Sequence, residues 1–569
     1  MNEVDGLKTE YQIEVESGTG FARLLVDGAL WARLWLGAKV DTTAGADELA
    51  RRSVPVVTEY SDGRRIVVEA QSSVWRQERF ILECRESHVA AWVEVEGEGD
   101  ITSLWLLGSN LSDPLATARL YSQAAYRSVY SPAPAQSGRW VRGAGESTAL
   151  SVGGTYLPGH SDWYFTPPPF CYAMSMAEAP SAVLTEPAGP WMGVSLVAAA
   201  GEYNFTDYEY LGHDGSFCLG LQYGGQVRVT EKFVSPRVIL TFGHATPADA
   251  LRDYAPRYGE QNGKPEKLDV PDWWSAPMFC GWGAQVVLAE ELGVAAPTAA
   301  TRISYDSFLS ALNARDIVPA TVVIDDKWQQ SYGTNVVDPV KWPQLRQWIR
   351  ARQAASQKVL LWLKLWDPEG LPADECVVNH LGVPVAADPT NPKFERRLRR
   401  MVRRMLGADG YGADGFKLDF SGRIPMSGSL ERHGQAWGVE LQHKLLEIIY
   451  SESKQVRPDA LVIGHVPHPY FADVLDMIRL NDVTPGLPVV RQMQQRAAIV
   501  QAVCPELLID ADNWQMPNID EWRQYMAVSA EIGVPALYYA TGVSVNEPFE
   551  PEDYELIAKA WQRRGEQTA

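Results

Sequence analysis

The pattern of hydrophobic and polar positions divides the chain into two parts. Over roughly the first 265 residues, short runs alternate between apolar and polar side chains, the period of half-buried strands. Clear examples lie at 23–27, 65–70, 90–95 and 226–230, and glycine-containing turns separate such runs. The first long helical pattern begins only at Thr246. This spacing of short strands is typical of a large β-sandwich, and we expect it to form an N-terminal domain over residues 1–265.

The pattern changes near Pro277, where short apolar runs begin to alternate with amphipathic helical patterns. The predicted strands are 278–282, 320–324, 359–366, 415–420, 461–464, 477–480, 506–509 and 535–538. The predicted helices are 301–314, 340–356, 392–406, 434–454, 488–502 and 518–532. Eight strands, nearly all followed by a helix, within about 260 residues match the size of a TIM barrel.

The predicted architecture is therefore multidomain, with α and β elements. A β-sandwich over 1–265 precedes a (β/α)8 barrel over 266–545, with a polar linker near 260–267 and a helical tail over 546–569. A doubly wound sheet is the alternative to the barrel. It is disfavoured because no Gly-x-Gly-x-x-Gly turn follows the first predicted strand.

Composition narrows the classes of function. The net charge of −20 disfavours nucleic-acid binding, which needs basic residues to neutralise phosphates. The sequence contains no run of about 20 apolar residues, so we expect no membrane-spanning helix. The first residues lack the basic and apolar regions of a secretory signal, so we expect a cytoplasmic protein. The six cysteines are scattered without a Cys-x-x-Cys pair, which predicts reduced core thiols rather than a zinc site or disulfides.

Polar and aromatic residues gather at the carboxyl ends of the predicted barrel strands, where TIM-barrel active sites lie. Carboxylates accept hydrogen bonds from neighbouring sugar hydroxyls, and indole rings cover the CH face of a sugar. We therefore predict that a small oligosaccharide or glycoside binds here. The candidate residues are Trp282, Asp325, Asp326, Trp328, Lys364, Trp366, Lys417, Asp419, His465, Arg479, Asp482 and Asp512.

Two of these carboxyl groups are candidate catalytic residues. Lys417 and Asp419 share one face of the strand at 415–420, an expensive pairing in a buried strand unless function requires it. Asp482, at the end of the sixth strand, could face Asp419 across the barrel mouth. Two such carboxyls, one attacking and one protonating, are what retaining glycoside cleavage needs, at about 5–5.5 Å apart. Lys417 would hold Asp419 ionised, and Arg479 would bind sugar hydroxyls or a carboxylate.

Other readings remain open at this point. Lys417 and Asp419 could form a buried ion pair without chemistry, and Asp482 could belong to a turn. Metal catalysis is weaker, because His465 and His468 lie in no clustered ligand set, and a serine hydrolase would need a Gly-x-Ser-x-Gly elbow. We expect no metal or organic cofactor. A transglycosidase, a sugar-binding protein without catalysis and a metal-dependent lyase or isomerase remain alternatives, and a homo-oligomer is compatible with the sequence.

Five segments resemble glycoside hydrolase family 36, the α-galactosidase family. They are Phe-Cys-Gly-Trp at 279–282, Val-Ile-Asp-Asp at 323–326, Phe-Lys-Leu-Asp-Phe at 416–420, Met-Ile-Arg-Leu-Asn-Asp at 477–482 and Leu-Ile-Asp-Ala-Asp at 508–512. Asp-Gly-Phe-Lys-x-Asp-Phe followed by Arg-Ile-Pro also resembles family 31, the α-glucosidase and α-xylosidase group. The family 36 resemblance implies an N-terminal β-supersandwich over 1–265, and either resemblance implies a (β/α)8 barrel and retaining hydrolysis of a terminal α-linked sugar.

The resemblance also implies individual roles. Asp419 matches the nucleophile and Asp482 the general acid/base. The implied sugar contacts are Asp325 and Asp326 with O4 and O6, Lys417 with O3 and O4, Arg479 with O2, and Trp282 and Trp328 as walls of the site.

The chain departs from the family pattern at the rim of the expected site. Lys327 follows the acid pair, Lys364 and Trp366 are additional on the third strand, and His465 stands where a cysteine often touches O2. The extra lysines suggest an unusual or anionic sugar as an alternative substrate.

Overall fold

The computed structural model describes residues 10–108, 121–124, 126–132, 141–143, 148–153, 165–178, 188–213, 215–263, 270–426 and 429–568. They divide into two compact units. One comprises Met1–Thr155, Pro167–Lys264 and Trp437–Glu440, and the other Tyr156–Thr166, Pro265–Ala436 and Leu441–Ala569. Much of the predicted linker lies outside the described residues. No described helix combines the length and apolar character that crossing a membrane requires.

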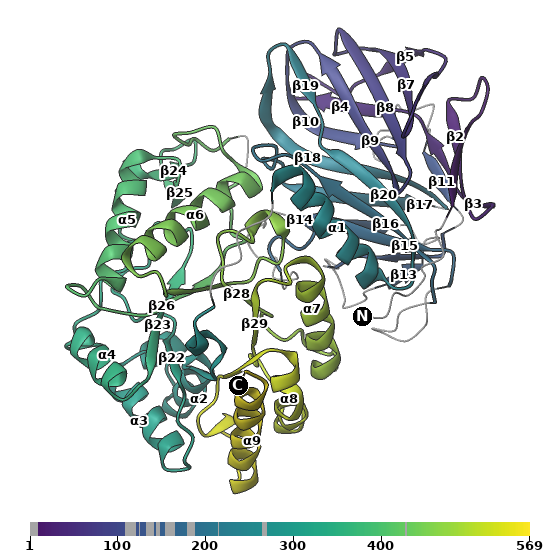
Figure 1. The fold of residues 1–569 in the computed structure, drawn as a ribbon. Coiled ribbons are helices and arrows are strands. Elements are labelled where there is room, and N and C mark those ends of the chain that lie inside the picture. The colour runs from purple at the N-terminus through teal and green to yellow at the C-terminus, as the bar shows by residue number, and fades with distance from the viewer. Residues whose placement is uncertain are drawn as a thin grey trace. The chain divides into compact units, whose positions relative to one another are not determined.

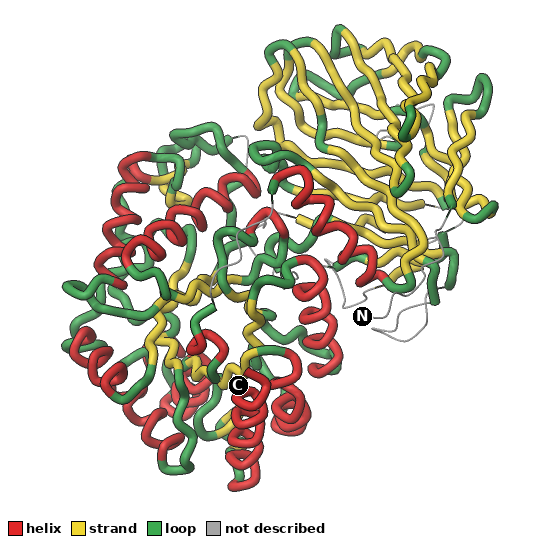
Figure 2. Tube along the Cα trace, in the orientation of Figure 1, coloured by secondary structure: helices red, strands yellow, loops and turns green. Residues whose placement is uncertain are grey.

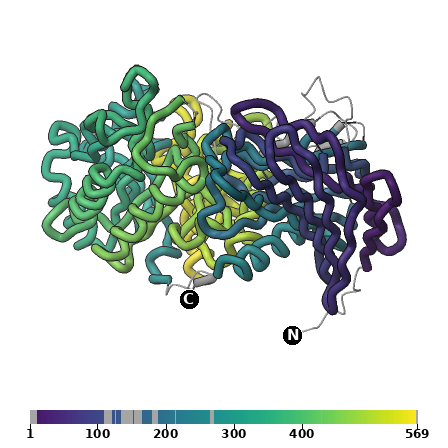
Figure 3. The backbone as a smooth tube through the Cα atoms, turned by 90° about the horizontal axis from the view of Figure 1, so that it is seen from above, coloured from purple at the N-terminus to yellow at the C-terminus, as the bar shows by residue number. Residues whose placement is uncertain are grey.

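The first unit contains two large antiparallel sheets, the predicted β-supersandwich (Figures 1 and 3). The nine-stranded sheet contains β1 Tyr11–Val15, β2 Phe21–Val26, β3 Ala29–Trp35, β4 Ala38–Thr42, β10 Gly99–Leu106, β11 Ser122–Ala124, β14 Thr148–Gly153, β17 Asp207–His213 and β18 Ser216–Val229. The eleven-stranded sheet contains β5 Leu49–Arg52, β6 Val56–Tyr60, β7 Gly63–Ser72, β8 Gln77–Arg85, β9 His88–Glu96, β12 Ser128–Tyr130, β13 Val141–Gly143, β15 Cys171–Ser175, β16 Trp191–Val197, β19 Lys232–Val234 and β20 Arg237–His244.

The helix predicted after Thr246 is longer than the sequence pattern indicated. It is α1, Pro247–Asn262, so its last turn occupies the start of the segment predicted as a linker. Thr246 and Asp249 form a capping box that satisfies two amide groups at its first turn. The helix packs on β15 and β16 through its buried residues, including Leu251 and Tyr254.

The second unit is a closed barrel of eight parallel strands with helices around it (Figure 2). The strands are β21 Met278–Cys280, β22 Thr321–Ile324, β23 Lys358–Lys364, β26 Gly415–Asp419, β27 Leu461–Gly464, β28 Met477–Arg479, β29 Leu508–Ala511 and β30 Val534–Leu537. Each lies within two residues of its predicted bounds. The barrel prediction is therefore confirmed and the doubly wound sheet is excluded.

The helices around the barrel include one that the sequence pattern missed. They are α2 Trp282–Leu292, α3 Arg302–Asn313, α4 Leu345–Ala354, α5 Pro392–Leu406, α6 Gly438–Val456, α7 Val489–Val503, α8 Ile519–Ile532 and α9 Pro551–Thr568. The segment of α2 was predicted as a loop. It begins two residues after β21 and Gly281 provides no side-chain cap, so the usual sequence signal of a helix start is absent. The hairpin of β24 Cys376–Val378 and β25 Pro384–Ala387 was also not predicted. The unit also contains four short 3-10 turns and a two-stranded ribbon. The turns are η1 Asp272–Ser275, η2 Ala296–Ala299, η3 Ala373–Glu375 and η4 Pro469–Phe471, and the ribbon pairs β31 Gly542–Ser544 with β32 Glu547–Pro548.

Candidate active site

One acid immediately precedes strand β26 and another ends it, and the two have different surroundings. At its start, Asp414 is buried, accepts hydrogen bonds from Val359 N and Gln353 Nε2, both at 2.9 Å, and pairs with Arg457. These contacts tie the strand to its neighbours, as expected at the stability face of a barrel. At its other end, Asp419 remains 23% exposed. Only Asp419 is therefore available to a bound molecule.

Three groups hydrogen-bond the Asp419 carboxylate, and an imidazole lies beside it. Its Oδ1 accepts from Arg479 Nη2 at 3.0 Å and from Phe420 N at 2.9 Å, while its Oδ2 accepts from Trp362 Nε1 at 3.2 Å. The Nε2 of His465 lies 3.8 Å from Oδ1. Burial alone would raise the pKa of Asp419, but Arg479 and Lys417 outweigh it and hold that pKa well below its usual range. Asp419 is thus a fixed, ionised carboxylate.

A single guanidinium joins three carboxylates at the barrel mouth. Arg479 Nη1 contacts Asp512 Oδ2 at 2.7 Å and Asp482 Oδ1 at 3.1 Å, while Nη2 contacts Asp419. Arg479 and Asp512 are buried, whereas the Asp482 side chain is 60% exposed. The predicted catalytic pair therefore meets around one cation, and Asp482 faces the open side.

Asp482 differs from Asp419 in its preferred protonation state. Although the side chain is 60% exposed, the surrounding protein removes part of the water around its carboxyl, and the carboxylates of Asp512 and Asp419 add repulsion. These effects exceed the attraction of Arg479 and raise the pKa of Asp482 to about 6. The site thus holds one ionised carboxylate beside one carboxyl that is protonated in mildly acidic solution.

Lys417 has a different direct partner from the one expected. Its Nζ donates to Asp325 Oδ2 at 2.7 Å and lies 3.3 Å from Cys280 Sγ, and both charged side chains are buried. Lys417 and Asp419 do lie on the same face of β26, but no direct ion pair joins them. The influence of Lys417 on Asp419 is a longer-range one through the field of its charge.

The second acid of the pair after β22 is more open than the first. Asp326 accepts from Tyr332 Oη at 2.7 Å, and burial with repulsion from Asp325 raises the pKa of Asp326 to about 6. Tyr332, quoted in no sequence motif, brings a partly exposed ring to this edge. Asp325 and Asp326 offer carboxyl groups on adjacent residues, a spacing that suits neighbouring hydroxyls.

The two rim lysines that suggested an anionic sugar are both ion-paired. Lys327 Nζ contacts Glu369 Oε2 at 2.6 Å, and Lys364 Nζ contacts Asp367 Oδ2 at 2.8 Å. Both amino groups also lie over the Tyr332 ring, at 3.7 and 4.3 Å from its centroid. Because each cation already has a carboxylate partner, the rim carries little net positive charge for an anionic substituent.

The tryptophans do not all have the positions expected of sugar platforms. Trp328 and Trp366 are buried, and their indoles donate to the carbonyls of Trp362 and Ser421, both at 2.8 Å. They support the strand ends rather than presenting a ring face. Trp282 is partly exposed and meets Trp514 edge to face at 6.0 Å. The available indole faces therefore come from the ends of β21 and β29.

The two histidines after β27 are both buried but differ in surroundings. His465 lies beside Asp419, and burial together with Arg479 lowers the pKa of His465 to about 4, so its ring is neutral near pH 7. His468 accepts from Tyr470 N at 3.1 Å and caps the η4 turn. His468 is thus part of the local structure, whereas His465 belongs to the candidate site.

Backbone strain concentrates at this end of the barrel. Lys327, Trp366, Phe420 and Asn481 all have left-handed φ, from 58° to 71°, within three residues after β22, β23, β26 and β28. Such conformations cost about 1–3 kcal/mol each in non-glycine residues and cluster at functional sites. Each sharp turn lies beside a candidate residue, so the strain accompanies the placement of the site.

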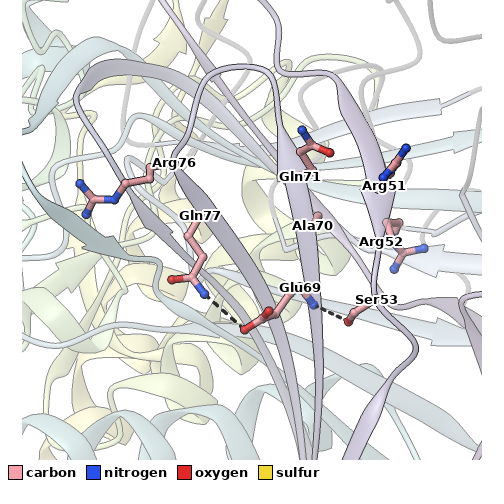
Figure 4. A pocket seen from close by; sticks show the side chains of 8 residues that line it. All are labelled: Arg51, Arg52, Ser53, Glu69, Ala70, Gln71, Arg76 and Gln77. Atoms are coloured by element: carbon pink, nitrogen blue, oxygen red, sulfur yellow. Dashed lines mark hydrogen bonds between the residues drawn. The ribbon is translucent and has the colours of Figure 1, made fainter.

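The first unit has a hollow of its own, of about 620 Å³ (Figure 4). Arg51 and Arg76 lie on opposite sides of it in Figure 4, and Arg76 already pairs with Glu96 at 3.2 Å. Glu69 accepts from Gln77 at 3.2 Å. None of the predicted site residues lines this hollow, and its polar groups do not converge on one point.

Comparison with known proteins supports the fold. No protein-family model and no curated protein match the chain. A family 31 sulfoquinovosidase from E. rectale shares 11% identity and a TM-score of 0.61, over 98% of this chain and 83% of that one. A family 36 α-galactosidase from Geobacillus stearothermophilus shares 11% identity and a TM-score of 0.54, over 98% and 78%. The cycloalternan-forming enzyme from Listeria monocytogenes shares 9% identity and a TM-score of 0.54, and the chain spans 54% of its length. The chain therefore has the fold of glycoside hydrolases of families 31 and 36.

Proposed function

We propose that this protein is a retaining α-glycosidase that hydrolyses a terminal α-linked sugar. Asp419 attacks the anomeric carbon and displaces the leaving group, forming a covalent glycosyl-enzyme. Asp482 donates its proton to the departing oxygen and then takes a proton from the water that releases the sugar. The observation that carries the proposal is that two carboxyl groups bonded to the same Arg479 differ in pKa. The carboxyl of Asp419 is held ionised, whereas the pKa of Asp482 is raised to about 6.

The surrounding residues suit a neutral sugar. Asp325 and Asp326 would accept hydrogen bonds from adjacent hydroxyls, and Trp282 would cover an apolar ring face. We propose an α-galactoside-like substrate first, in line with the α-galactosidase that shares the fold. The sulfoquinovosidase with the same fold makes a charged glycoside worth including, although the ion pairs of Lys327 and Lys364 favour a neutral one.

A panel of 4-nitrophenyl α-glycosides tests the proposal. The panel contains the galactoside, glucoside, xyloside, arabinoside and sulfoquinovoside, and NMR of the first-formed product reports whether the anomeric configuration is retained. Asp419→Ala should reduce turnover of the best substrate by at least about 10³-fold, because the attacking group is lost. Asp414→Asn serves as the matched control, since it alters the acid that immediately precedes the same strand, away from the site. Turnover by Asp419→Ala equal to that of wild type, or an inverted product, would refute the mechanism.

A further inference from the structure

Of the residues shortly before strand β15 that the structure describes, two belong to the barrel unit. They are Phe165 and Thr166, after which the chain continues from Pro167 in the first unit. Thr166 is buried and anchored through its main chain. Its N donates to the carbonyl of His465 at 3.2 Å, and its carbonyl accepts from Gln442 Nε2 at 2.5 Å. A residue far from the barrel in sequence is therefore fixed against the end of β27.

The Thr166 hydroxyl closes a ring of hydrogen bonds with Ser421 and His465. Its Oγ1 lies 3.2 Å from His465 Nδ1 and 3.2 Å from Ser421 Oγ, which lies 3.1 Å from His465 Nε2. A neutral imidazole has one donor and one acceptor nitrogen, and each hydroxyl donates one proton and also accepts. Three protons therefore complete the three bonds in either direction around the ring. Both imidazole nitrogens are satisfied only while both hydroxyls are present.

The connection after β26 has a glycine where Thr166 approaches. A Cβ on Gly422 would lie 2.6 Å from Thr166 Cγ2 and 2.7 Å from its Cβ, closer than side chains tolerate. The approach of Thr166 thus depends on the absence of a side chain at 422. Ser421 and Gly422 immediately follow Phe420, whose amide holds Asp419, so the same short segment contacts both the carboxylate and Thr166.

The imidazole held in this way lies beside the proposed nucleophile. Its Nε2 is 3.8 Å from Asp419 Oδ1, and the other charged groups facing it are Arg479 and Lys417. Without the Thr166 hydroxyl, Nδ1 would lose its partner in a buried site, and an unpaired polar group there costs about 1–3 kcal/mol. The imidazole would then be free to rotate or to change its tautomer. Either change would alter the polar surroundings of the carboxylate that must attack the sugar.

We propose that Thr166 is a positioning residue of this active site, and that its hydroxyl, with Ser421, fixes the His465 imidazole in one orientation beside Asp419. This inference rests on the proposed glycosidase function. A single residue from the N-terminal part of the sequence thereby completes the polar surroundings of the barrel's nucleophile.

The test compares Thr166→Val with Thr166→Ser in the full-length protein. Valine keeps the branched shape and removes the hydroxyl, whereas serine keeps the hydroxyl. With the 4-nitrophenyl α-glycoside that wild type hydrolyses best, we expect Thr166→Val to lower kcat about tenfold or more, with KM within threefold, because misplacement of a reacting group chiefly slows the chemical step. Thr166→Ser should stay within threefold of wild type in both constants.

The matched control is Thr321→Val, on strand β22. Thr321 is also a buried threonine of the barrel, but its Oγ1 has no hydrogen-bond partner among the described residues. We expect Thr321→Val to keep wild-type kcat. If Thr166→Val and Thr321→Val behave alike, or if Thr166→Ser is as impaired as Thr166→Val, the positioning role of the hydroxyl is overturned.

Two further variants keep the outcome interpretable. Ser421→Ala removes the other hydroxyl of the ring and should lower kcat similarly, so it carries the test if Thr166→Val does not fold; wild-type kcat in Ser421→Ala would overturn the inference. Asp419→Ala, assayed in parallel, reports on the underlying function. An inactive Asp419→Ala beside a fully active Thr166→Val refutes only the inference, whereas an active Asp419→Ala refutes the proposed function itself.

Discussion

Replacing Asp512 by asparagine should move the alkaline limb of the kcat/KM profile to lower pH. Asp512 and Asp482 both bond the same Nη1 of Arg479, at 2.7 and 3.1 Å. The Asp512 carboxylate disfavours ionisation of Asp482 by repulsion and also neutralises part of the positive charge of Arg479. Asp512→Asn removes the repulsion and leaves Arg479 more available to Asp482. Both effects lower the pKa of Asp482 from its value of about 6.

The geometry sets the size of this shift. The shared nitrogen limits the separation of the two carboxylate oxygens to about 6 Å, and because Asp482 is 60% exposed, an effective dielectric constant of about 40–80 applies. Coulomb's law then gives a repulsion of about 0.7–1.4 kcal/mol, or about 0.5–1 pKa unit. Protonated Asp482 is present below its pKa and is lost as pH rises. At pH 7 the variant should therefore retain about one third to one tenth of the wild-type kcat/KM.

The assay is kcat/KM from pH 4 to 9 with an alkyl α-glycoside, whose poor leaving group requires the proton. Asp510→Asn is the matched control on the same strand β29. Burial and Asp512 raise the pKa of Asp510 to about 8, so its carboxyl is already uncharged near pH 6 and asparagine changes little there. We expect an alkaline limb within about 0.2 units of wild type in this control. An unshifted limb in Asp512→Asn, or one that moves to higher pH, would show that Asp482 is not the group that titrates.

Two substitutions separate stability from chemistry. Lys417→Met should lower the free energy of unfolding by about 3–5 kcal/mol in urea denaturation, because it leaves the buried Asp325 carboxylate unpaired. The double variant Lys417→Met with Asp325→Asn should recover part of that loss, and an equally unstable double variant would contradict this account. Asp414→Asn should lower the free energy of unfolding by about 1.5–3 kcal/mol, because it weakens the contacts with Arg457 and Val359 N, while kcat stays within twofold of wild type. A large loss of kcat without loss of stability would contradict a structural role for Asp414.

The regular elements of the barrel could be predicted because they repeat a local signal. Each strand is a short apolar run, such as Leu461–Gly464, and the surrounding helices such as α5 carry an apolar face bounded by a clear cap at Asn391. Helix α2 has no such cap. The β24–β25 hairpin does have a local signal, a short connection that contains Gly382, but its strands of three and four residues are too short to show a clear period. The acids at the strand ends followed from strand phase alone, since parallel strands in a closed barrel end at one face.

Side-chain partners could not be read from the sequence in the same way. The sequence pairs Lys417 with Asp419 because the two residues share a strand face, but the direct partner of Lys417 is Asp325, which follows β22. Lys327 and Lys364 have no obvious partner in the sequence, whereas in the structure Glu369 and Asp367 pair with them. Trp328 and Trp366 are of the residue type that stacks on sugars and follow barrel strands in the sequence, but in the structure both are buried in the core.

The sequence by itself determined the N-terminal β-sandwich, the eight-stranded barrel and the placement of Asp419 and Asp482 at strand ends, because hydrophobic period and chain order are local properties. Only the tertiary structure decided that Arg479 joins Asp419, Asp482 and Asp512, and that Thr166 reaches His465 from 299 residues away. These contacts arise when closure of the barrel brings remote segments within hydrogen-bond distance. Their energies depend on the burial and charge that closure creates, and no local pattern in the chain encodes either one.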